Sequence, residues 1–416
     1  MRNILHTAVL AAPAVCVIFI AALALWTPAS INGVAPEAFA PAGEAGGAVP
    51  ATSYAGKTPA PSPVPPAPTP SADIPKLKVG ISMPTKSLQR WERDGDDMQA
   101  QFKRLGYDVD LWYAGNNEVA MQISQIENMI TDGCKVLIIA AIDGGVLTEV
   151  LKQAKAKSIP VIAYEYLIVN TDAVNYYVTF NWSQSGLYQA RYIANKLALE
   201  ATRGPYNIEF FTGSTMDGNY GFRISGAKSA FQPYIDSGKL VAKSGQTLNG
   251  YDCGIRGFEA DEARKRMEAL ISKCGYGPKG TRLDAVFCMY DFIAQGVSAA
   301  LEAAGYTADN FPIVTGSGCD KASVINIRKG LQSMSVFADT RLLAERAVTM
   351  AQSLLNGEKP EVNDTKTYDN IAAMIPSYLC DYTVVTADNI KECLIDSGYY
   401  TWDDIGGPPG SMPMDK

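Results

Sequence analysis

Polar and aromatic side chains follow several short apolar runs of this sequence, at the points where the runs end. Lys86, Arg90 and Trp91 come after one such run, and Asp143 and Asp291 come after two others. The remaining residues in equivalent positions are Asn181, Trp182 and Asn219. Because the carboxyl ends of parallel strands are where an open sheet binds its ligand, we expect these side chains to contact a polar molecule.

Each of these residues also has a purely structural explanation. Lys86 and Arg90 fit the solvated start of a helix, and Trp91 fits internal packing. Asp143 precedes a glycine, as in an ordinary turn, and Asp291 is suited to cap the helix that follows it. Asn219 can cap a helix in the same way. Position alone therefore leaves both interpretations open.

The composition argues against most catalytic chemistry. The chain has one histidine, His6, in its N-terminal segment, so the rest of the chain has no Ser–His or Cys–His nucleophile and no histidine zinc site. Walker, nucleophile-elbow and GxGxxG motifs are absent. Pairs of carboxylates remain available for glycoside chemistry. The net charge is −7 without a basic stripe, which disfavours nucleic acid. We expect no enzyme, no cofactor and no metal.

The N-terminus predicts export. Residues 8–26 carry no charge and are long enough to cross a bilayer. We assign residues 1–34 to a signal peptide, cleaved near Ala38–Ala40, or to an uncleaved signal-anchor. Lipid attachment at Cys16 is a third, weaker alternative, since no lipobox precedes it. Each alternative places the rest of the chain outside the cytoplasm, at the cell surface or in the periplasm, and a membrane tether is favoured.

A linker rich in proline, alanine and glycine follows at residues 35–75. Its composition cannot bury a core and favours extended, semi-rigid conformations. An odd number of cysteines remains beyond the linker, so at least one is unpaired or pairs with another chain. They are Cys134, Cys253, Cys274, Cys288, Cys319, Cys380 and Cys393.

From Lys76 onward, strand-like and helix-like segments alternate. The amphipathic segment Val119–Asp132 predicts a helix, Lys135–Ala141 a strand buried on both faces, Leu147–Lys157 a helix and Pro160–Tyr164 a strand. The alternation continues to about residue 356 and yields about ten strand–helix units, too many for one ordinary sheet. The sequence therefore predicts an α/β protein with two similar lobes.

Four stretches resemble type I periplasmic sugar-binding proteins, in particular the xylose-binding and multiple-monosaccharide-binding group that serves ABC transporters. They are Val79–Gly95, Ser124–Gly144, Lys359–Asn370 and Ile375–Tyr400. The resemblance implies two doubly wound parallel-sheet lobes joined by a three-crossover hinge, the periplasmic-binding-protein-like I fold. It places the crossovers near Asn181, Phe337 and Lys366. The implied N-terminal lobe is 76–181 with 337–366, the C-terminal lobe is 182–336 with 367–404, and 405–416 is a flexible tail.

The resemblance also implies a function. A sugar would bind between the lobes and be presented to an ABC permease. The alternatives are a binding protein that serves a chemoreceptor or a histidine kinase, and a degenerate receptor with a non-sugar polar ligand. A transcription regulator of similar architecture would need an N-terminal helix-turn-helix where this chain has its apolar segment and linker.

Departures from the family pattern concentrate in the expected site. Tyr-Asp-Arg is replaced by Tyr164–Tyr166, Phe-Asp-Asn by Phe180–Trp182, Gly-Gln-Asp by Gly316–Asp320, and a lysine by Ala338. These changes remove charged hydrogen bonds and add rings, so we favour a different or larger glycan-like ligand. The expected ligand-binding residues are Lys86, Arg90, Trp91, Asp143, Glu165, Tyr166, Asn181, Trp182, Asn219, Asp291 and Asp320.

Overall fold

A computed structural model describes residues 76–215, 219–248, 252–255 and 259–410. The segment 8–26, with Cys16, lies outside these residues, as do the linker and the last residues of the expected tail. No helix among the described residues is both long enough and apolar enough to cross a membrane.

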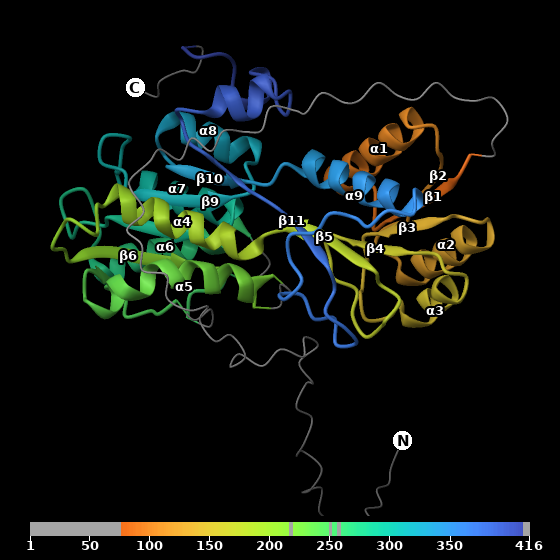
Figure 1. Ribbon diagram of the computed structural model, residues 1–416. Helices are drawn as coiled ribbons and strands as arrows, with labels where there is room; N and C mark the ends of the chain where they lie inside the picture. The colour runs from red at the N-terminus through yellow and green to blue at the C-terminus, as the bar shows by residue number, and fades with distance from the viewer. Residues whose placement is uncertain (1–75, 216–218, 249–251, 256–258, 411–416) are drawn as a thin grey trace, which may run out of the picture. The chain divides into compact units, whose positions relative to one another are not determined.

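The first lobe is built on a six-stranded parallel sheet of order β11-β5-β4-β3-β1-β2. Its strands are β1 (Lys78–Met83), β2 (Asp108–Tyr113), β3 (Val136–Ile139), β4 (Val161–Tyr164), β5 (Tyr176–Phe180) and β11 (Ser377–Cys380). Its helices are α1 (Gln89–Arg104), α2 (Val119–Thr131), α3 (Thr148–Ala156) and α9 (Thr340–Leu355). Helices α1 and α9 pack together on one face of the sheet, and α2 and α3 pack on the other (Figure 1).

Helices on both faces explain the sequence of the central strands. Every residue of β3 (VLII) and β4 (VIAY) is buried. Strands covered on both sides are apolar throughout instead of alternating. The edge strand β2 (DVDLWY), by contrast, contains two aspartates, and all of its residues are half-buried or exposed.

The second lobe has a six-stranded sheet of order β12-β10-β9-β8-β6-β7, in which only β12 runs antiparallel. Its strands are β6 (Tyr206–Phe211), β7 (Leu240–Val241), β8 (Ala285–Cys288), β9 (Ile313–Ser317), β10 (Met334–Phe337) and β12 (Thr383–Val385). Its helices are α4 (Trp182–Lys196), α5 (Tyr220–Asp236), α6 (Ala260–Cys274), α7 (Asp291–Ala303) and α8 (Lys321–Lys329). A π-helical turn, η2 (Lys391–Asp396), and a 3₁₀ turn, η3 (Asp403–Ile405), complete it.

One predicted strand is much shorter than expected. The sequence predicts a strand over 240–246, but β7 ends at Val241. The chain then turns because the buried carboxylate of Glu209 accepts the Ser244 backbone N–H at 3.1 Å and its hydroxyl at 2.6 Å. A side-chain acceptor has replaced the ladder hydrogen bonds that would extend the strand.

The chain passes between the two sheets after β5, after β10 and after β11. The third passage corrects the predicted crossover near Lys366. Residues 377–380 form β11, which pairs with β5 in the first sheet, so the chain changes sheet only between Cys380 and Thr383. The segment 367–380 thus belongs to the first lobe and not to the second.

Candidate functional site

An arginine held by two buried acids lies where α1 meets the end of β4. The Arg90 Nη2 is 3.0 Å from Glu165 Oε2, and its Nε is 3.6 Å from Asp94 Oδ2. The Arg90 side chain is 34% exposed, whereas those of Asp94 and Glu165 are 1% and 2% exposed. The buried acids therefore orient a guanidinium whose Nε and Nη2 are themselves buried, while part of the Arg90 side chain remains exposed.

The hydrogen bonding of this acid–arginine cluster is incomplete. Asp94 Oδ1 and the Arg90 Nε have no partner in hydrogen-bonding geometry, and Glu165 Oε2 has only its ion pair with Arg90. Tyr164 donates to Asp94 Oδ2 at 2.9 Å. Burial raises the pKa of Asp94, and the nearby Arg90 charge opposes that rise. Buried polar atoms are nearly always bonded, so unfilled ones mark a candidate ligand site.

Backbone strain adds to the special character of Glu165. Its φ is +64°, a left-handed conformation that is costly for a residue with a side chain. Its carbonyl accepts from the Tyr177 hydroxyl at 2.7 Å and from Thr179 Oγ1 at 3.1 Å. The surrounding side chains hold this conformation, which turns the Glu165 carboxylate toward Arg90.

Two rings adjoin the cluster. The Arg90 guanidinium lies 4.7 Å from the centre of the buried Trp91 ring. The centre of the Tyr166 ring lies 5.7 Å from the centre of the Trp91 ring. Tyr166 is 44% exposed. Arg90, Trp91, Glu165 and Tyr166, all expected from the sequence, are therefore neighbours in the structure. Tyr166 carries the accessible ring surface of the group.

Trp182 is placed differently from the sequence expectation of an open stacking surface. It is 6% exposed, and its Nε1 donates to Thr179 Oγ1 at 3.0 Å. The Arg223 guanidinium lies 4.7 Å from its ring centre. Phe180 and Tyr382, from the first and third crossovers, meet it edge-on. The Trp182 ring is thus a packing centre at the crossovers.

Arg223 was not expected from the sequence, and it organises the second lobe beside Trp182. It is buried, and its Nη1 donates to Ser185 Oγ at 2.6 Å and to Ser317 Oγ at 3.3 Å. The Tyr290 ring centre lies 4.8 Å from the guanidinium. The sequence offers one weak indication of Arg223: it follows Asn219 by one helical turn and so lies on the same face of the helix. Asp94 was missed likewise, although it stands one turn after Arg90.

Asp291, expected from the sequence to face a ligand, is buried and hydrogen-bonded within its own lobe in this structure. It is 1% exposed. Its oxygens accept from Ser335 Oγ at 2.9 Å, Gln332 Nε2 at 3.0 Å and the Asp320 backbone N–H at 3.2 Å. Burial, and secondarily the Asp320 charge, raise the pKa of Asp291 to about 7. Asp291 therefore ties α7 to the β9–α8 loop and to β10.

Asp320 is also engaged with its own lobe. Its side chain caps α8 by accepting from the Ser323 backbone N–H at 3.0 Å, and it accepts from Gln295 Nε2 at 2.8 Å. Asp320, and not Asp291, makes the side-chain helix cap: α7 begins at Asp291 without one. The capping explanation considered for Asp291 thus fits Asp320 instead.

The other expected residues lie apart from the acid–arginine cluster. Lys86 is exposed, 3.9 Å from Glu92 and 4.8 Å from the centre of the Tyr113 ring. Asp143 is exposed and accepts the Gly145 backbone N–H at 2.8 Å, which is an Asx turn. Asn181 is half-buried, and its backbone N–H donates to the Cys380 carbonyl. Asn219 precedes α5 and is half-buried.

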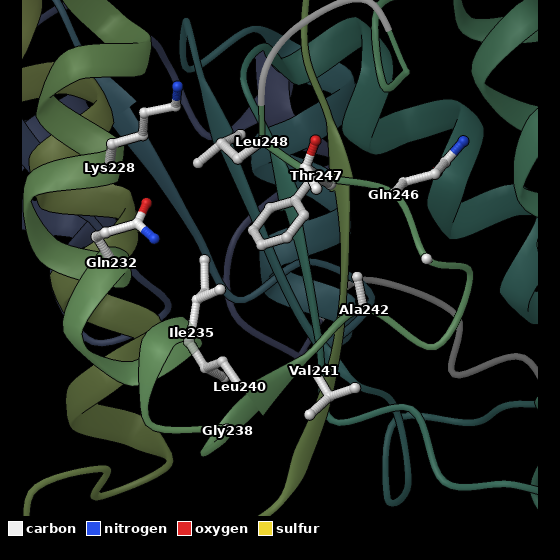
Figure 2. Close-up of a pocket in the computed structure, with 12 residues that line it drawn as sticks. Lys228, Gln232, Ile235, Gly238, Leu240, Val241, Ala242, Gln246, Thr247 and Leu248 are labelled. Carbon is white, nitrogen blue, oxygen red and sulfur yellow. The ribbon is translucent and has the colours of Figure 1, made fainter.

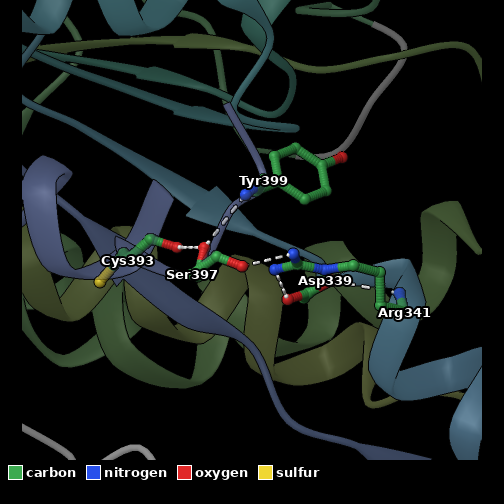
Figure 3. A network of polar contacts seen from close by, with 5 residues as sticks. All are labelled: Asp339, Arg341, Cys393, Ser397 and Tyr399. Carbon is green, nitrogen blue, oxygen red and sulfur yellow. Dashed lines mark hydrogen bonds and ion pairs between the residues drawn. The ribbon is translucent and has the colours of Figure 1, made fainter. Parts of the chain in front are cut away.

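Contacts around Tyr399 join the start of α9 to the C-terminal segment. Arg341 pairs with Asp339 and donates from Nη1 to the Ser397 carbonyl at 2.7 Å (Figure 3). The Tyr399 ring lies 5.1 Å from the Arg341 guanidinium and 4.8 Å from that of Arg93 in α1. Elements of the first lobe thus meet the segment that follows η2 of the second.

Two hollows lie outside the acid–arginine cluster. One, of about 500 Å³, lies beside β7 and α5 and is lined by Lys228, Gln232, Ile235, Leu240, Val241 and Leu248, among others (Figure 2). No sequence-expected site residue lines it. The other, of about 580 Å³, lies beside β2 and includes Lys86. The described residues contain no cluster of acids, cysteines or histidines able to hold a metal ion.

Comparison with known proteins gives consistent matches. The periplasmic binding protein domain matches residues 79–359. The multiple sugar-binding periplasmic protein SbpA of Azospirillum brasilense is 45% identical over 78% of this chain and 90% of that protein. The multiple sugar-binding periplasmic receptor ChvE of Rhizobium radiobacter is 43% identical over 79% of this chain and 92% of its own length. A Clostridium phytofermentans ABC transporter solute-binding protein, solved with β-D-glucose, is 49% identical with a TM-score of 0.67, covering 79% of this chain and 99% of that one.

Proposed function

Since this chain belongs to the periplasmic binding protein domain family, we propose that it is a solute-binding protein that captures a sugar between its lobes and presents it to an ABC importer. The family implies an extracytoplasmic location. The relatives named above are binding proteins by name, and none is named as an enzyme. The proposed ligand is a monosaccharide or a larger glycan-like molecule.

The observation that carries the proposal is the partly exposed Arg90, fixed by two buried acids. A guanidinium offers several donors in a rigid plane, and the acids supply acceptors beside it. Sugar hydroxyls both donate and accept, so a pyranose or furanose ring can use both kinds of group. The exposed ring of Tyr166 supplies an apolar surface next to these polar groups.

We place the primary contacts at Arg90, Glu165 and Tyr166, and further contacts at Lys86, Asp143, Asn181 and Asn219. Trp91 and Trp182 would act by positioning, because their rings are already covered by protein. Asp291 and Asp320 would hold the strand-end loops of the second lobe. This assignment narrows the set of contacts expected from the sequence.

A thermal-shift screen of the purified protein against neutral monosaccharides and oligosaccharides tests the proposal. A ligand that binds only the folded state increases the free energy of unfolding, by about 2.7 kcal/mol at one hundred times its Kd, and so raises the melting temperature. We expect at least one sugar to do so, and Arg90→Ala to abolish the shift. A panel without any stabilising sugar would overturn the sugar assignment and leave a non-sugar polar ligand.

We further propose that the N-terminal segment tethers the protein to the outer face of the membrane. The support is the charge-free run 8–26 followed by the proline-rich spacer. Cell fractionation with N-terminal sequencing tests this. Protein recovered only in soluble form, with its N-terminus beyond Ala40, would contradict the tether without affecting the binding function.

A further inference from the structure

The hollow beside β2, here called the β2 hollow, has the features of a second binding site. It is lined by Lys86, Asp96, Gln99, Trp112, Tyr113 and Asn116, among others, and measures about 580 Å³. This volume falls within the range of about 300–1,000 Å³ typical of small-molecule sites. All of these residues lie in the first lobe, on α1, on the edge strand β2 and on the loops that follow β1 and β2.

An exposed tryptophan is the central feature of the β2 hollow. Trp112 is 48% exposed. Tryptophan buries more apolar area than most side chains, so leaving half of it in water forgoes stabilisation that packing would supply. No ring contact of Trp112 exists among the described residues. Its surface is therefore available to an external molecule.

The walls beside Trp112 are held in place by internal contacts. The Tyr113 hydroxyl donates to the Glu92 carbonyl at 3.1 Å and to Asp96 Oδ1 at 3.2 Å. A Cβ atom on Gly95 would collide with that hydroxyl, so the absence of a side chain there lets Tyr113 pack against α1. The Lys86 ammonium lies 4.8 Å from the centre of the Tyr113 ring.

The polar groups of the hollow match a neutral, hydroxyl-rich ligand. The side-chain amide nitrogens of Gln99 and Asn116 have no hydrogen-bond partner among the described residues, so both can donate. Asp96 can accept and Lys86 can donate. Because Lys86 and Asp96 bring opposite charges to the same hollow, it favours neither an anion nor a cation.

Helix α1 separates the β2 hollow from the acid–arginine cluster. Arg90 and Asp94, one turn apart, face Glu165. The Asp96 side chain contacts Tyr113 instead, as does the Glu92 backbone carbonyl. At 100° per residue, positions 94 and 96 point in nearly opposite directions, so the two sites occupy different faces of one helix.

From these observations we propose that the β2 hollow is a second saccharide site, in which one ring of a neutral oligosaccharide stacks on Trp112 while Gln99, Asn116, Asp96 and Lys86 bond its hydroxyls. Lys86 is the one residue assigned to both this site and the proposed interlobe site, and binding at the β2 hollow does not require Arg90. It would hold a glycan on the outer flank of the first lobe, where chains longer than a monosaccharide have room to continue into solvent.

Fluorine NMR of the full-length protein labelled with 5-fluorotryptophan tests this proposal. The Trp112 resonance is assigned from its absence in Trp112→Phe. It is then followed during titration with cellohexaose, maltohexaose, xylohexaose and chitohexaose. We expect a saturable shift with at least one of them, which persists in Arg90→Ala. Asn116→Ala should bind that oligosaccharide more weakly.

Isothermal titration calorimetry then compares the oligosaccharide affinity of two matched variants, each made in the Arg90→Ala background. Trp112→Ala should weaken binding at least about tenfold, in line with the energy of aromatic contacts. Leu342→Ala removes a similarly exposed apolar side chain from α9 of the same lobe and should bind as its parent does. Melting temperatures verify that each variant is folded.

The proposal is overturned if no oligosaccharide shifts the Trp112 resonance, or if the shift disappears in Arg90→Ala. The latter result would show a response relayed from the interlobe site.

Discussion

Acidic side chains are buried at strand ends in both lobes, but their environments differ. In the first lobe, Asp94 and Glu165 face the charged Arg90: Glu165 Oε2 is held by the ion pair with Arg90, and Asp94 Oδ1 has no partner in hydrogen-bonding geometry. In the second lobe, Asp291 accepts from neutral groups on Ser335, Gln332 and the Asp320 backbone, and both of its oxygens are used. The first cluster (Arg90, Asp94 and Glu165), here called unfilled, can still bond a ligand. The second (Asp291 with Ser335, Gln332 and Asp320), here called filled, holds its loops in place. The same residue type at the same kind of position thus has two functions.

The first prediction concerns the loss of stability when Asp291, the centre of the filled cluster, is replaced. Asp291→Ala leaves the Ser335 hydroxyl and the Asp320 backbone N–H without their acceptor in a buried site, and it removes one of the two acceptors of Gln332 Nε2. Each such donor costs about 1–3 kcal/mol, so the free energy of unfolding should fall by at least about 2 kcal/mol in urea titrations. Asp143→Ala, at an exposed turn, should change it by about 0.5 kcal/mol or less. Equal losses of stability in Asp291→Ala and Asp143→Ala would contradict the structural function assigned to Asp291.

A glycine pair probes the packing of the filled cluster. A Cβ on Gly316 would collide with Asp291 Oδ1 and lie 2.6 Å from Gln332 Nε2, whereas a Cβ on Gly221 in α5 meets nothing within 4 Å. Gly316→Ala should therefore destabilise by about 1–3 kcal/mol through overpacking. Gly221→Ala should stabilise by about 0.5–1 kcal/mol, because alanine favours the helix. Thermal unfolding of the two variants measures both signs, and a stable Gly316→Ala would show that the cluster is loose.

A third prediction concerns the pH dependence of stability. The pKa of Asp291 is raised to about 7 in the folded state, so between about pH 4 and pH 7 the folded protein binds the proton more tightly than the unfolded chain. The contribution of this group to stability is present at low pH and is lost as pH rises through 7. The parent should lose stability relative to Asp291→Asn over this interval, by at most about 1.4 kcal/mol per pH unit. Parallel pH profiles would contradict the raised pKa.

Sequence patterns predicted the sheets better than the crossovers. Continuous apolar runs such as 136–139 and 161–164 have one favourable environment, a strand covered on both faces, and the structure places both there. The strand β11 (SYLC) is short and only half-buried, so its pattern does not distinguish a strand from a terminal segment. The third crossover was therefore predicted too early.

The candidate site shows a similar limit. Position after a strand identified Arg90, and the comparison with the family pattern identified Glu165, which the structure places 3.0 Å from Arg90. Position after a strand also identified Asp291. Position cannot reveal that Ser335 and Gln332, more than forty residues later, fill the Asp291 oxygens. Arg223 was missed because its partners, Trp182 and Ser317, are distant in the sequence and meet only through tertiary packing. Burial of a polar side chain depends on such long-range partners.

Isothermal titration calorimetry of two variants tests most directly whether the ligand binds at the unfilled cluster. The titrant is the sugar that most stabilises the protein, with D-glucose as the first trial. Arg90→Ala should lose binding, by at least about 100-fold in Kd, because two buried acids are left without their cation and the ligand without its donors. Asp291→Asn, measured where it is fully folded, should bind within a few-fold of the parent. Unchanged affinity in Arg90→Ala, or loss of binding only in Asp291→Asn, would contradict the account.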